Sequence, residues 1–368
     1  MPIAQSQAFF RTSPFELVAN AEAATYWAGR PDVRKRLDKI CRAYVRRSDS
    51  SIDVIWANFG AGKTHALLHL AYMLAQNYAD QAKTAAAFIE MPQNLNSFLD
   101  LYRRIIAAVP TNLLEACLCG VDDRKSNHNL RRAATAFAQG GSIEKAMARD
   151  WLLAEKPYLR ELKSVVGIDS RIETDVIACD ILDNIVSLCG QQGIRFVILL
   201  DEFQRIAVLP KRKRDPILSN LRSVFSHNSS FLSMVVAVSS RAERTALDLI
   251  PPELRTLMGM RPIISLPEMS CEEAEDYIVE RLHFFRPAEY TGSKEAPFTS
   301  EMLIALVNFI HSNDNAKLIP RTLHQVLAFL FDEIMDSPDQ TMSIEVMNQE
   351  LGELNWENLD VQPDSWAP

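Results

Sequence analysis

Short apolar runs, each closed by polar or turn residues, recur along the first 266 residues of the chain. A run of this length between turns is typical of a buried strand. Such strands are predicted at 52–57, 85–90, 195–200, 231–238 and 262–266. Helical patterns separate them, and strands that alternate with helices predict a parallel sheet covered by helices on both faces. The expected fold class is therefore α/β.

Amphipathic segments between the apolar runs predict the helices. In 31–47, the residues Val33, Leu37, Ile40 and Tyr44 recur at helical spacing, with basic residues between them. An apolar stripe of this kind needs a partner surface, so this helix is expected to pack on the sheet. Further helices are predicted at 63–77, 95–108, 173–188 and 216–225.

Two regions depart from this alternation. From 110 to about 165 the pattern is helical but irregular, with breaks near Asn127 and at 140–141, which predicts a helical insertion. After 266, helical segments follow one another at 270–285, 299–311 and 320–336, which predicts a small all-helical domain. The expected parts are an N-terminal arm (1–24), an α/β domain (25–267), a helical domain (268–338) and an acidic, partly disordered tail (339–368).

Composition narrows the class of protein. The chain has 368 residues, of which 48% are hydrophobic and 23% charged, as in ordinary soluble globular proteins. Its net charge of −8 argues against a generally basic coat for nucleic acid, although a local basic patch is compatible with it. No apolar run approaches the roughly 18 residues of a membrane helix, and the N-terminus lacks the pattern of a signal peptide. We therefore expect a cytoplasmic protein with no membrane partner.

The cysteines and histidines offer only secondary candidates. The cysteines are scattered without the CxxC spacing of a zinc site, so reduced, mostly buried thiols are expected, with Cys117 and Cys119 as a redox or metal alternative. His65 and His69 lie four apart on a predicted helix and could bind a metal. Ala66 stands where the glutamate of a zinc-protease HExxH motif would be, so we expect both histidines to have packing roles.

The central candidate site is the sequence ANFGAGKT at 57–64, between a predicted strand and a predicted helix. A nucleoside triphosphate needs backbone N–H donors from a tight loop, the positive end of a helix dipole, a lysine, and a hydroxyl that holds Mg²⁺. Gly60 and Gly62 let the loop wrap, Lys63 would reach the β- and γ-phosphates, and Thr64 would bind the metal. Ala57 replaces the first glycine of the usual GxxxxGK[ST] pattern. The predicted nucleotide contacts are Asn58, Phe59, Gly60, Ala61, Gly62, Lys63, Thr64 and His65.

A second candidate follows the apolar run 197–200, which ends in Asp201 and Glu202. Acids that end a buried parallel strand lie at the edge of the sheet where ligands of such folds bind. Asp201 is expected to hold Mg²⁺, and Glu202 to position and polarise the attacking water. Together with the loop at 57–64, this pair predicts that the ligands are ATP and Mg²⁺ and that the protein is an ATPase.

These segments resemble AAA+ ATPases of the initiator, origin-recognition type, which are related to STAND signalling ATPases. The resemblance covers about residues 25–336, apart from the expected helical insertion, and rests first on the GxGKT core and the acidic motif at 201–206. The sequence WAGRPD at 27–32 resembles the GRxxE entry segment of the family. The resemblance implies that Gly29 and Arg30 pack near the adenine, and that the C-terminal helical domain is a lid.

The same resemblance implies further site residues. Ser239, followed by Ser240, occupies the sensor-1 place, where a polar residue touches the γ-phosphate or the water. Arg321 occupies the sensor-2 place at the start of a lid helix and would reach the γ-phosphate. Arg255, or alternatively Arg261, would be an arginine finger that enters the site of a neighbouring subunit, which makes hydrolysis depend on assembly.

A compact basic run is formed by Lys211, Arg212, Lys213 and Arg214, and is expected in a loop before the next helix. It is either a solvated loop or a contact with the phosphate backbone of DNA, because clustered cations release counterions without reading bases. Basic residues between 124 and 149 would extend this surface or bind a protein partner.

The combined interpretation is an initiator-like AAA+ ATPase that binds and hydrolyses ATP with Mg²⁺. Its nucleotide state would control homo-oligomerisation, as a ring or filament, and engagement of DNA or a DNA-acting partner in transposition, replication loading or mobile-DNA defence. A protein partner is expected through the helical insertion or the C-terminal tail. Two alternatives stay open: a STAND-like protein-assembly switch without DNA binding, and an ATP-binding scaffold with weak turnover.

Overall fold

The computed structural model describes residues 9–46, 49–76, 83–118, 127–228, 230–239, 250–258, 262–337 and 341–356. The chain forms two compact units, each drawn from segments that are far apart in the sequence. We call them the sheet unit, which comprises Arg36–Trp56 and Leu70–Ile264, and the lid unit, which comprises Met1–Lys35, Ala57–His69 and Ser265–Pro368.

Five parallel strands form the sheet, in the order β2-β3-β4-β1-β5. They are β1 (Ser51–Ala57), β2 (Thr84–Glu90), β3 (Arg195–Asp201), β4 (Leu232–Ser239) and β5 (Ile264–Ser265). β3 has a parallel neighbour on each side, with Phe196 opposite both Ala85 and Leu232. Every residue of β3 and β4 is buried, which explains why these strands are continuous apolar runs in the sequence. The strand predictions are confirmed, with β5 shorter than expected.

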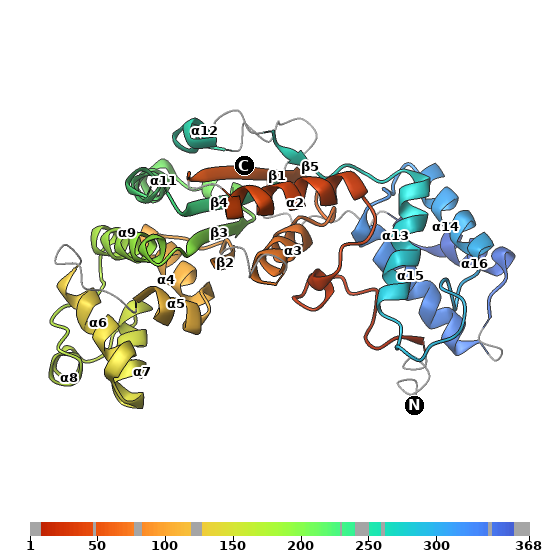
Figure 1. Cartoon of the computed structure of the whole chain (residues 1–368). Helices are drawn as coiled ribbons and strands as arrows, with labels where there is room; N and C mark the ends of the chain where they lie inside the picture. Colours follow the sequence, from red (N-terminus) through yellow and green to blue (C-terminus); the bar gives the residue numbers. More distant parts are fainter. Residues whose placement is uncertain are drawn as a thin grey trace. The chain divides into compact units, whose positions relative to one another are not determined.

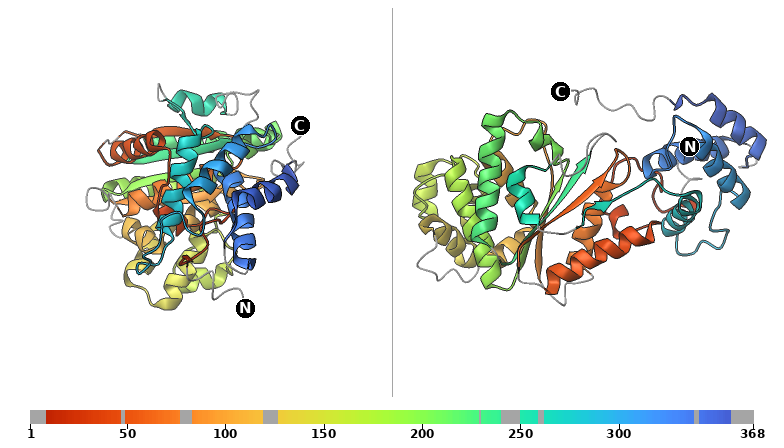
Figure 2. Two further views of the ribbon diagram at one scale, coloured as in Figure 1. Left: turned by 90° about the vertical axis from the view of Figure 1, so that its right-hand side faces the viewer. Right: turned by 90° about the horizontal axis from the view of Figure 1, so that it is seen from above.

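Helices flank this sheet, as Figures 1 and 2 show. They are α2 (Pro31–Arg46), α4 (Phe98–Ala108), α9 (Asp175–Gln191) and α11 (Lys211–His227), with the shorter α10 (Gln204–Ala207) and α12 (Pro252–Met258). α4 packs on β2 and on α9, and α11 packs on α9. Ser97 and Thr174 accept first-turn N–H groups of α4 and α9, which explains where these helices begin.

The predicted insertion between α4 and α9 is helical. Its helices in the described residues are α5 (Thr111–Leu118), α6 (His128–Gln139), α7 (Ser142–Leu152) and α8 (Leu159–Val165). Asn127 caps α6, and α7 begins after Gly141, so the predicted breaks are confirmed. Leu130, Trp151 and Leu162 are buried in the same hydrophobic cluster as the sheet. The insertion is therefore part of the core of the sheet unit.

A disulfide joins Cys117 on α5 to Cys189 on α9. The prediction that the cysteines are reduced is therefore wrong for this pair, whose members are 72 residues apart in the sequence. Cys119, the other candidate, lies outside the described residues. The free cysteines of the described chain are Cys41, Cys179 and Cys271. Burial raises the pKa of Cys41 to about 12, which keeps this thiol protonated and unreactive.

The lid unit contains the three helices that the sequence predicts after 266, and one more. They are α13 (Cys271–Phe284), α14 (Ser300–Ser312), α15 (Pro320–Asp336) and the additional α16 (Ile344–Glu353), with the short η1 (Ala23–Thr25) nearer the N-terminus. Ser270 and Glu273 form a capping box that fixes the start of α13. No helix in the described residues combines the length and apolar character that are needed to cross a membrane.

Both predicted terminal segments contribute to the core of the lid unit. Met347 and Leu351 of α16 are buried in it, so residues 344–353 of the acidic tail form a helix that the sequence interpretation did not predict. Phe10 and Phe15 pack in the same core with their rings 5.9 Å apart. Burial of large apolar side chains is what holds such segments to a domain, at roughly 1.5–3 kcal/mol for each side chain.

Candidate nucleotide site

The loop between β1 and α3 (Lys63–Ala75) has the backbone that its sequence predicts. Gly60 and Gly62 have φ angles of +75° and +100°, in the region that residues with a Cβ rarely adopt. α3 begins at Lys63, so the N–H groups of its first turn and the positive end of its dipole stand at the end of the loop. Glycines in this conformation before a helix N-terminus fit a phosphate group. We call residues 57–64 the phosphate loop.

Lys63 is held over the phosphate loop. Its side chain is buried, and Nζ donates to the carbonyl oxygens of Asn58 (2.8 Å) and Ala57 (3.3 Å). The same ammonium is 5.4 Å from the centre of the Phe59 ring. A buried ammonium is costly unless polar groups compensate for lost water, and the loop carbonyls do so here. Thr64, the predicted metal ligand, follows on α3 and is half-buried.

The lid helix α15 contacts the phosphate loop directly. The N–H of Arg321 donates to the carbonyl oxygen of Gly60 (3.2 Å), and the Arg321 side chain is exposed. A Cβ on Gly60 would lie 2.8 Å from the Cβ of Arg321 and 3.2 Å from Cδ1 of Ile319. Glycine is therefore required at position 60 by both its φ and the approach of α15. The structure brings Arg321, the predicted sensor-2 arginine, to the loop, and its contact with a γ-phosphate stays a prediction.

Gly60→Ala is expected to destabilise the protein by about 2–4 kcal/mol, because the new Cβ combines a left-handed backbone with overpacking against α15. Gly193→Ala is the matched control. Gly193 has a φ of +67° but nothing within 4 Å of its Cβ position, so backbone strain alone should cost about 1–2 kcal/mol. Urea unfolding measures both losses. Equal losses would mean that α15 does not pack on the phosphate loop.

Arg30 connects the phosphate loop to the chain that enters the lid helices. It is buried, with Nη1 donating to the carbonyl oxygen of Ala61 (2.6 Å) and Nη2 to that of Pro267 (2.5 Å). The neighbouring Gly29 donates its N–H to the carboxylate of Glu280 on α13 (2.8 Å). The guanidinium is thus engaged within the protein. This geometry supports a positioning role for Arg30.

His65 and His69 on α3 bind backbone carbonyls. Nε2 of His65 is 3.0 Å from the oxygen of Tyr26, and Nδ1 of His69 is 2.7 Å from that of Ala24, so each of these nitrogens carries the proton. The Trp27 ring lies 5.6 Å and 5.5 Å from the two imidazoles. Burial lowers the pKa of His65 to about 3, so this ring is neutral at pH 7. Within the described chain no group of three or more His, Cys, Asp or Glu side chains could hold a metal ion.

Asp201 and Glu202 end β3 in the sheet unit. Asp201 is buried, and its Oδ1 accepts the N–H of Glu202 (2.8 Å). Glu202 has a φ of +53°, which is uncommon for a residue with a side chain and recurs at functional sites. Its Oε1 is 3.5 Å from Oγ of Ser239 at the end of β4. The structure therefore brings the predicted base and the sensor-1 serine together, while Ser240 lies outside the described residues.

Gln204 and Arg205 belong to this group, and the sequence interpretation missed both. The Gln204 side chain donates from Nε2 to Glu202 Oε2 (2.8 Å), and its Oε1 accepts the N–H of Ser239 (3.0 Å). Arg205 forms ion pairs with Glu202 (3.6 Å) and with Glu90 at the end of β2 (3.3 Å). The sequence did contain a signal for both residues, because Gln204 and Arg205 are long polar side chains two and three residues after Glu202. A side chain at such a position, or at the end of a neighbouring strand, is close enough to orient the Glu202 carboxylate.

Arg255 lies on α12 with its side chain exposed. Its Nε donates to the carbonyl oxygen of Ile250 (2.6 Å), which fixes the base of the guanidinium. An exposed and locally anchored arginine is compatible with a finger that reaches another subunit, and that role stays a prediction. The alternative, Arg261, lies outside the described residues.

The basic run 211–214 forms the first turn of α11. The prediction of a loop is therefore wrong here. Pro216 is a frequent residue in first turns and so suggested a later start, yet the helix begins five residues before it. Lys211 and Arg212 are exposed and form no ion pair within the described residues. Cations at a helix N-terminus meet the positive end of the dipole, so this turn has a strong positive potential.

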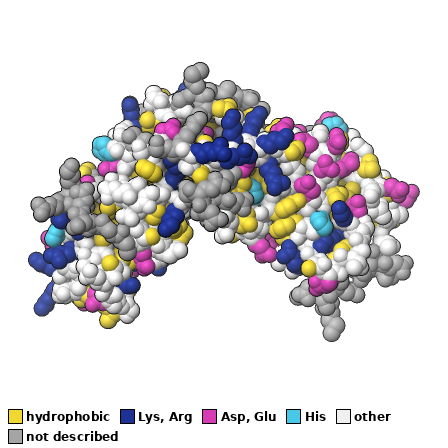
Figure 3. All heavy atoms as spheres, viewed as in Figure 1, with side chains coloured by type: hydrophobic (Ala, Val, Ile, Leu, Met, Phe, Trp, Pro, Cys, Tyr) yellow, Lys and Arg dark blue, Asp and Glu magenta, His cyan; other side chains and the backbone are white. Residues whose placement is uncertain are grey.

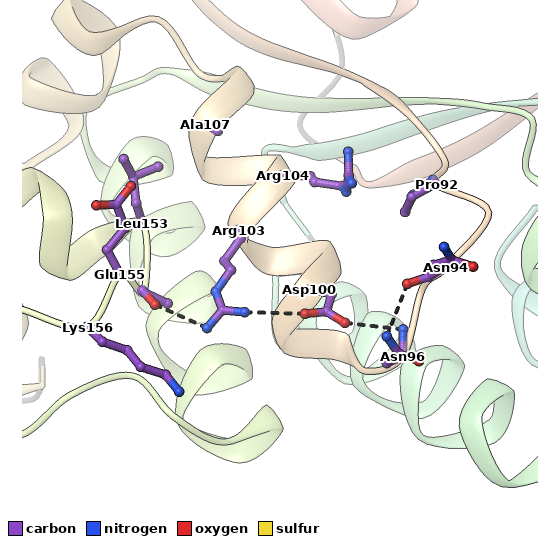
Figure 4. A pocket seen from close by; sticks show the side chains of 11 residues that line it. Pro92, Asn94, Asn96, Asp100, Arg103, Arg104, Ala107, Leu153, Glu155 and Lys156 are labelled. Atoms are coloured by element: carbon purple, nitrogen blue, oxygen red, sulfur yellow. Dashed lines mark hydrogen bonds and ion pairs between the residues drawn. The ribbon is translucent and has the colours of Figure 1, made fainter.

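A cavity of about 740 Å³ lies where α4 meets the helical insertion (Figure 4). Arg103 crosses it and binds Asp100 (3.3 Å) and the carbonyl oxygen of Ala154 (3.1 Å). Arg104 and Lys156 also line it, and neither has a hydrogen-bond or ion-pair partner among the described residues. Two cations in this situation favour an anionic group. The rest of the lining is Pro92, Asn94, Asn96, Ala107, Leu153 and Glu155.

Solved structures of origin-recognition proteins are similar to this chain. The ORC2 protein of Aeropyrum pernix, in complexes with ADPNP and ADP, is 13% identical, with 96% of this chain and 74% of that chain covered at a TM-score of 0.62. The A. pernix ORC1 protein in complex with DNA is 12% identical, with 93% and 69% covered at a TM-score of 0.53. No protein-family model matches the sequence, and no curated protein does. The chain therefore has the P-loop NTPase fold of the origin-recognition type of AAA+ ATPase, with a helical C-terminal region.

Proposed function

We propose that this protein is an ATPase whose nucleotide state controls its self-assembly and its engagement of DNA. The observation that carries the proposal is the contact between α15 and the phosphate loop, because it joins a predicted γ-phosphate ligand, Arg321, to the carbonyl oxygen of Gly60. The loop leaves β1 and the acidic pair leaves β3, which are parallel strands of one sheet with only β4 between them. Ligands of open parallel sheets bind at the carboxyl ends of the strands.

The proposed roles follow from the chemistry of each side chain. Lys63 binds the β- and γ-phosphates, and the residues that would hold Mg²⁺ are Thr64 and Asp201. Bound Mg²⁺ would supply charge neutralisation at the phosphates. Glu202 takes the proton of the attacking water, and its carboxylate is oriented by Gln204, which also holds Ser239. A base that is held in one orientation is what water activation requires.

The segment at Gly29 and Arg30 is proposed to support the nucleotide site rather than to contact the base. Two nitrogens of Arg30 donate hydrogen bonds to the carbonyl oxygens of Ala61 and Pro267. A nucleotide that draws in the phosphate loop would therefore act through Arg30 on the chain that enters α13. This contact offers a route by which ATP could set the position of the lid helices.

DNA engagement is proposed through the first turn of α11. Lys211, Arg212, Lys213 and Arg214 form that turn, where the helix dipole adds to their charge. Backbone contacts by such a group give affinity without sequence preference. The solved A. pernix ORC1 protein is in complex with DNA, which makes DNA a reasonable partner to test for a protein of this fold.

Neutralising this turn is expected to weaken DNA binding in the presence of ATP. Replacement of Lys211, Arg212 and Lys213 by glutamine should lower the slope of log K against log salt by about 2–3, since each lost phosphate contact removes about 0.9. The measurement is a salt titration of a duplex of random sequence by fluorescence anisotropy. ATP turnover is measured on the same samples. If turnover persists but no DNA binds, the protein would still be an ATPase, and DNA would be rejected as its partner.

A protein-assembly switch without DNA is the second candidate, and the helical insertion favours it. Ile143 on α7 is 67% exposed and Tyr158 before α8 is 76% exposed, which is high for large apolar side chains. The cavity with Arg104 and Lys156 lies beside the same insertion. ATP-driven oligomers that ignore DNA but lose a protein partner on Tyr158→Ala would select this candidate.

A further inference from the structure

α2 has two faces of opposite character. Leu37, Ile40, Cys41 and Tyr44 are buried on its inner face. The Tyr44 hydroxyl donates a hydrogen bond to Asp53 of β1 (2.7 Å). These contacts fix the helix against the sheet, so its outer side chains have a defined direction.

The outer face of α2 is a line of cations. Lys35, Lys39, Arg42 and Arg46 follow one another at i, i+4, i+7 and i+11, which places all four on one side of the helix, opposite the buried residues. All four are exposed. We call them the α2 stripe. At 1.5 Å per residue the stripe is about 16 Å long. Figure 3 shows a dense group of Lys and Arg side chains over this helix.

Neighbouring acids neutralise the α2 stripe only in part. The helix has six cations and two acids, a net charge of +4, in a chain whose total is −8. Lys35 pairs with Asp32 (3.1 Å) and Arg42 with Asp38, but exposed pairs of this kind gain little free energy. Like charges at i, i+4 on a helix repel one another by a few tenths of a kcal/mol. An anionic partner would relieve this repulsion. The packing of α2 on the sheet does not depend on these four cations.

We propose that the α2 stripe binds the phosphate backbone of a nucleic acid, as a second contact separate from the first turn of α11. One DNA strand carries a phosphate for every 3.4 Å of helix axis, so a stripe about 16 Å long faces roughly four or five phosphates. The four cations are about 4.5–6 Å apart along α2, so each can reach a different phosphate. The stripe has no exposed aromatic side chain for stacking on bases, so the contact is with the backbone and independent of sequence.

Two other anionic partners fit less well. A membrane-surface helix inserts an apolar face between lipids, and the apolar face of α2 is already buried in the protein. An acidic protein surface, including that of a second copy of this chain, lacks the regular charge spacing of a phosphate backbone. Both are outcomes of the test below.

The experiment compares the wild-type chain with the variant Lys35→Gln, Lys39→Gln, Arg42→Gln, Arg46→Gln. Binding to a random duplex of roughly 30 base pairs, several times the length of the stripe, is measured by anisotropy from low to moderate salt without nucleotide. The slope of log K against log salt should fall by about 3–4, because four contacts of about 0.9 each are lost. ATP turnover without DNA should be unchanged, since no stripe residue has a role in the proposed ATPase site.

A control variant separates the stripe from net charge. Glutamine at Lys83, Arg160, Lys163 and Lys294 changes the charge of the chain equally at exposed positions outside α2, and should leave the slope unchanged. An equal fall in both variants, or an unaltered slope in the stripe variant, would overturn the proposal. So would a wild-type chain that binds no duplex but binds phosphatidylserine vesicles, or self-associates, through these four residues. None of these results bears on whether ATP is hydrolysed.

Discussion

Glu202→Gln should reduce ATP turnover by about 10²- to 10⁴-fold and leave the affinity for ATP nearly unchanged, because the amide keeps the shape of the side chain but cannot accept a proton. The oxygen of the new amide can still accept the hydrogen bond of Gln204 Nε2, which holds the carboxylate in the wild-type chain at 2.8 Å. The left-handed backbone at position 202 is also kept. The substitution therefore removes the proposed base and little else.

Phosphate release measures turnover, and a fluorescent ATP analogue measures affinity on the same protein. Glu90→Gln is the matched control, since Glu90 also ends a strand and also pairs with Arg205, at 3.3 Å. Its carboxylate has no proposed catalytic role, and turnover should stay within about twofold of wild type because Glu90 is exposed and the new amide oxygen can still accept a hydrogen bond from Arg205. Turnover that survives Glu202→Gln would assign the base elsewhere. No turnover in the wild-type chain, with ATP still bound, would favour the scaffold alternative.

The strands and the phosphate loop could be predicted because their physical causes are local. A strand buried on both faces must be apolar throughout, as β3 is from Phe196 to Leu200, and such a run can be read without knowledge of its neighbours. The glycines of the phosphate loop are likewise required by their own φ angles. The helix α2 was predicted to within a residue because its buried face repeats at helical spacing.

The features that were missed depend on contacts between distant residues. Cys117 and Cys189 pair because α5 and α9 pack together, and no local pattern indicates that packing. α16 is polar enough to read as an acidic tail, and only Met347 and Leu351 are buried in the lid core. Gln204 looks like a surface residue of a short helix until β4 brings the N–H of Ser239 within 3.0 Å of its amide oxygen.

The lid unit places a constraint on how ATP could act. The phosphate loop, Arg30 and the start of α15 all belong to this unit. The N–H of Arg321 binds the carbonyl oxygen of Gly60, and the side chain of Arg30 binds that of Ala61. A ligand on the phosphate loop would therefore act first on the lid helices, before any other subunit is involved. The proposed hydrolysis would need Glu202 in addition, and the proposed arginine finger of a neighbour would be the last element to be supplied.

Arg255→Ala is expected to lower turnover by about 10³-fold or more, as loss of an arginine finger does, with no change in ATP affinity. Arg255 is exposed and makes its hydrogen bond to Ile250 through Nε, so its removal should not disturb the fold of α12. Arg255→Lys should recover only part of the rate, because an ammonium cannot donate two parallel hydrogen bonds to a phosphate. Arg261→Ala is measured beside it, since that residue is the alternative finger.

Mixing two inactive variants distinguishes a finger that acts between subunits from one that acts within its own. In a mixture of Arg255→Ala and Glu202→Gln chains, some interfaces combine an intact Glu202 from one chain with an intact Arg255 from the other. Turnover should then return to a fraction of the wild-type rate and rise with protein concentration, because assembly is bimolecular. A mixture as inactive as its components would argue that the arginine serves the site of its own chain. A fully active Arg255→Ala chain would show that Arg255 is not part of the site. There would then be no reason to expect that hydrolysis depends on assembly.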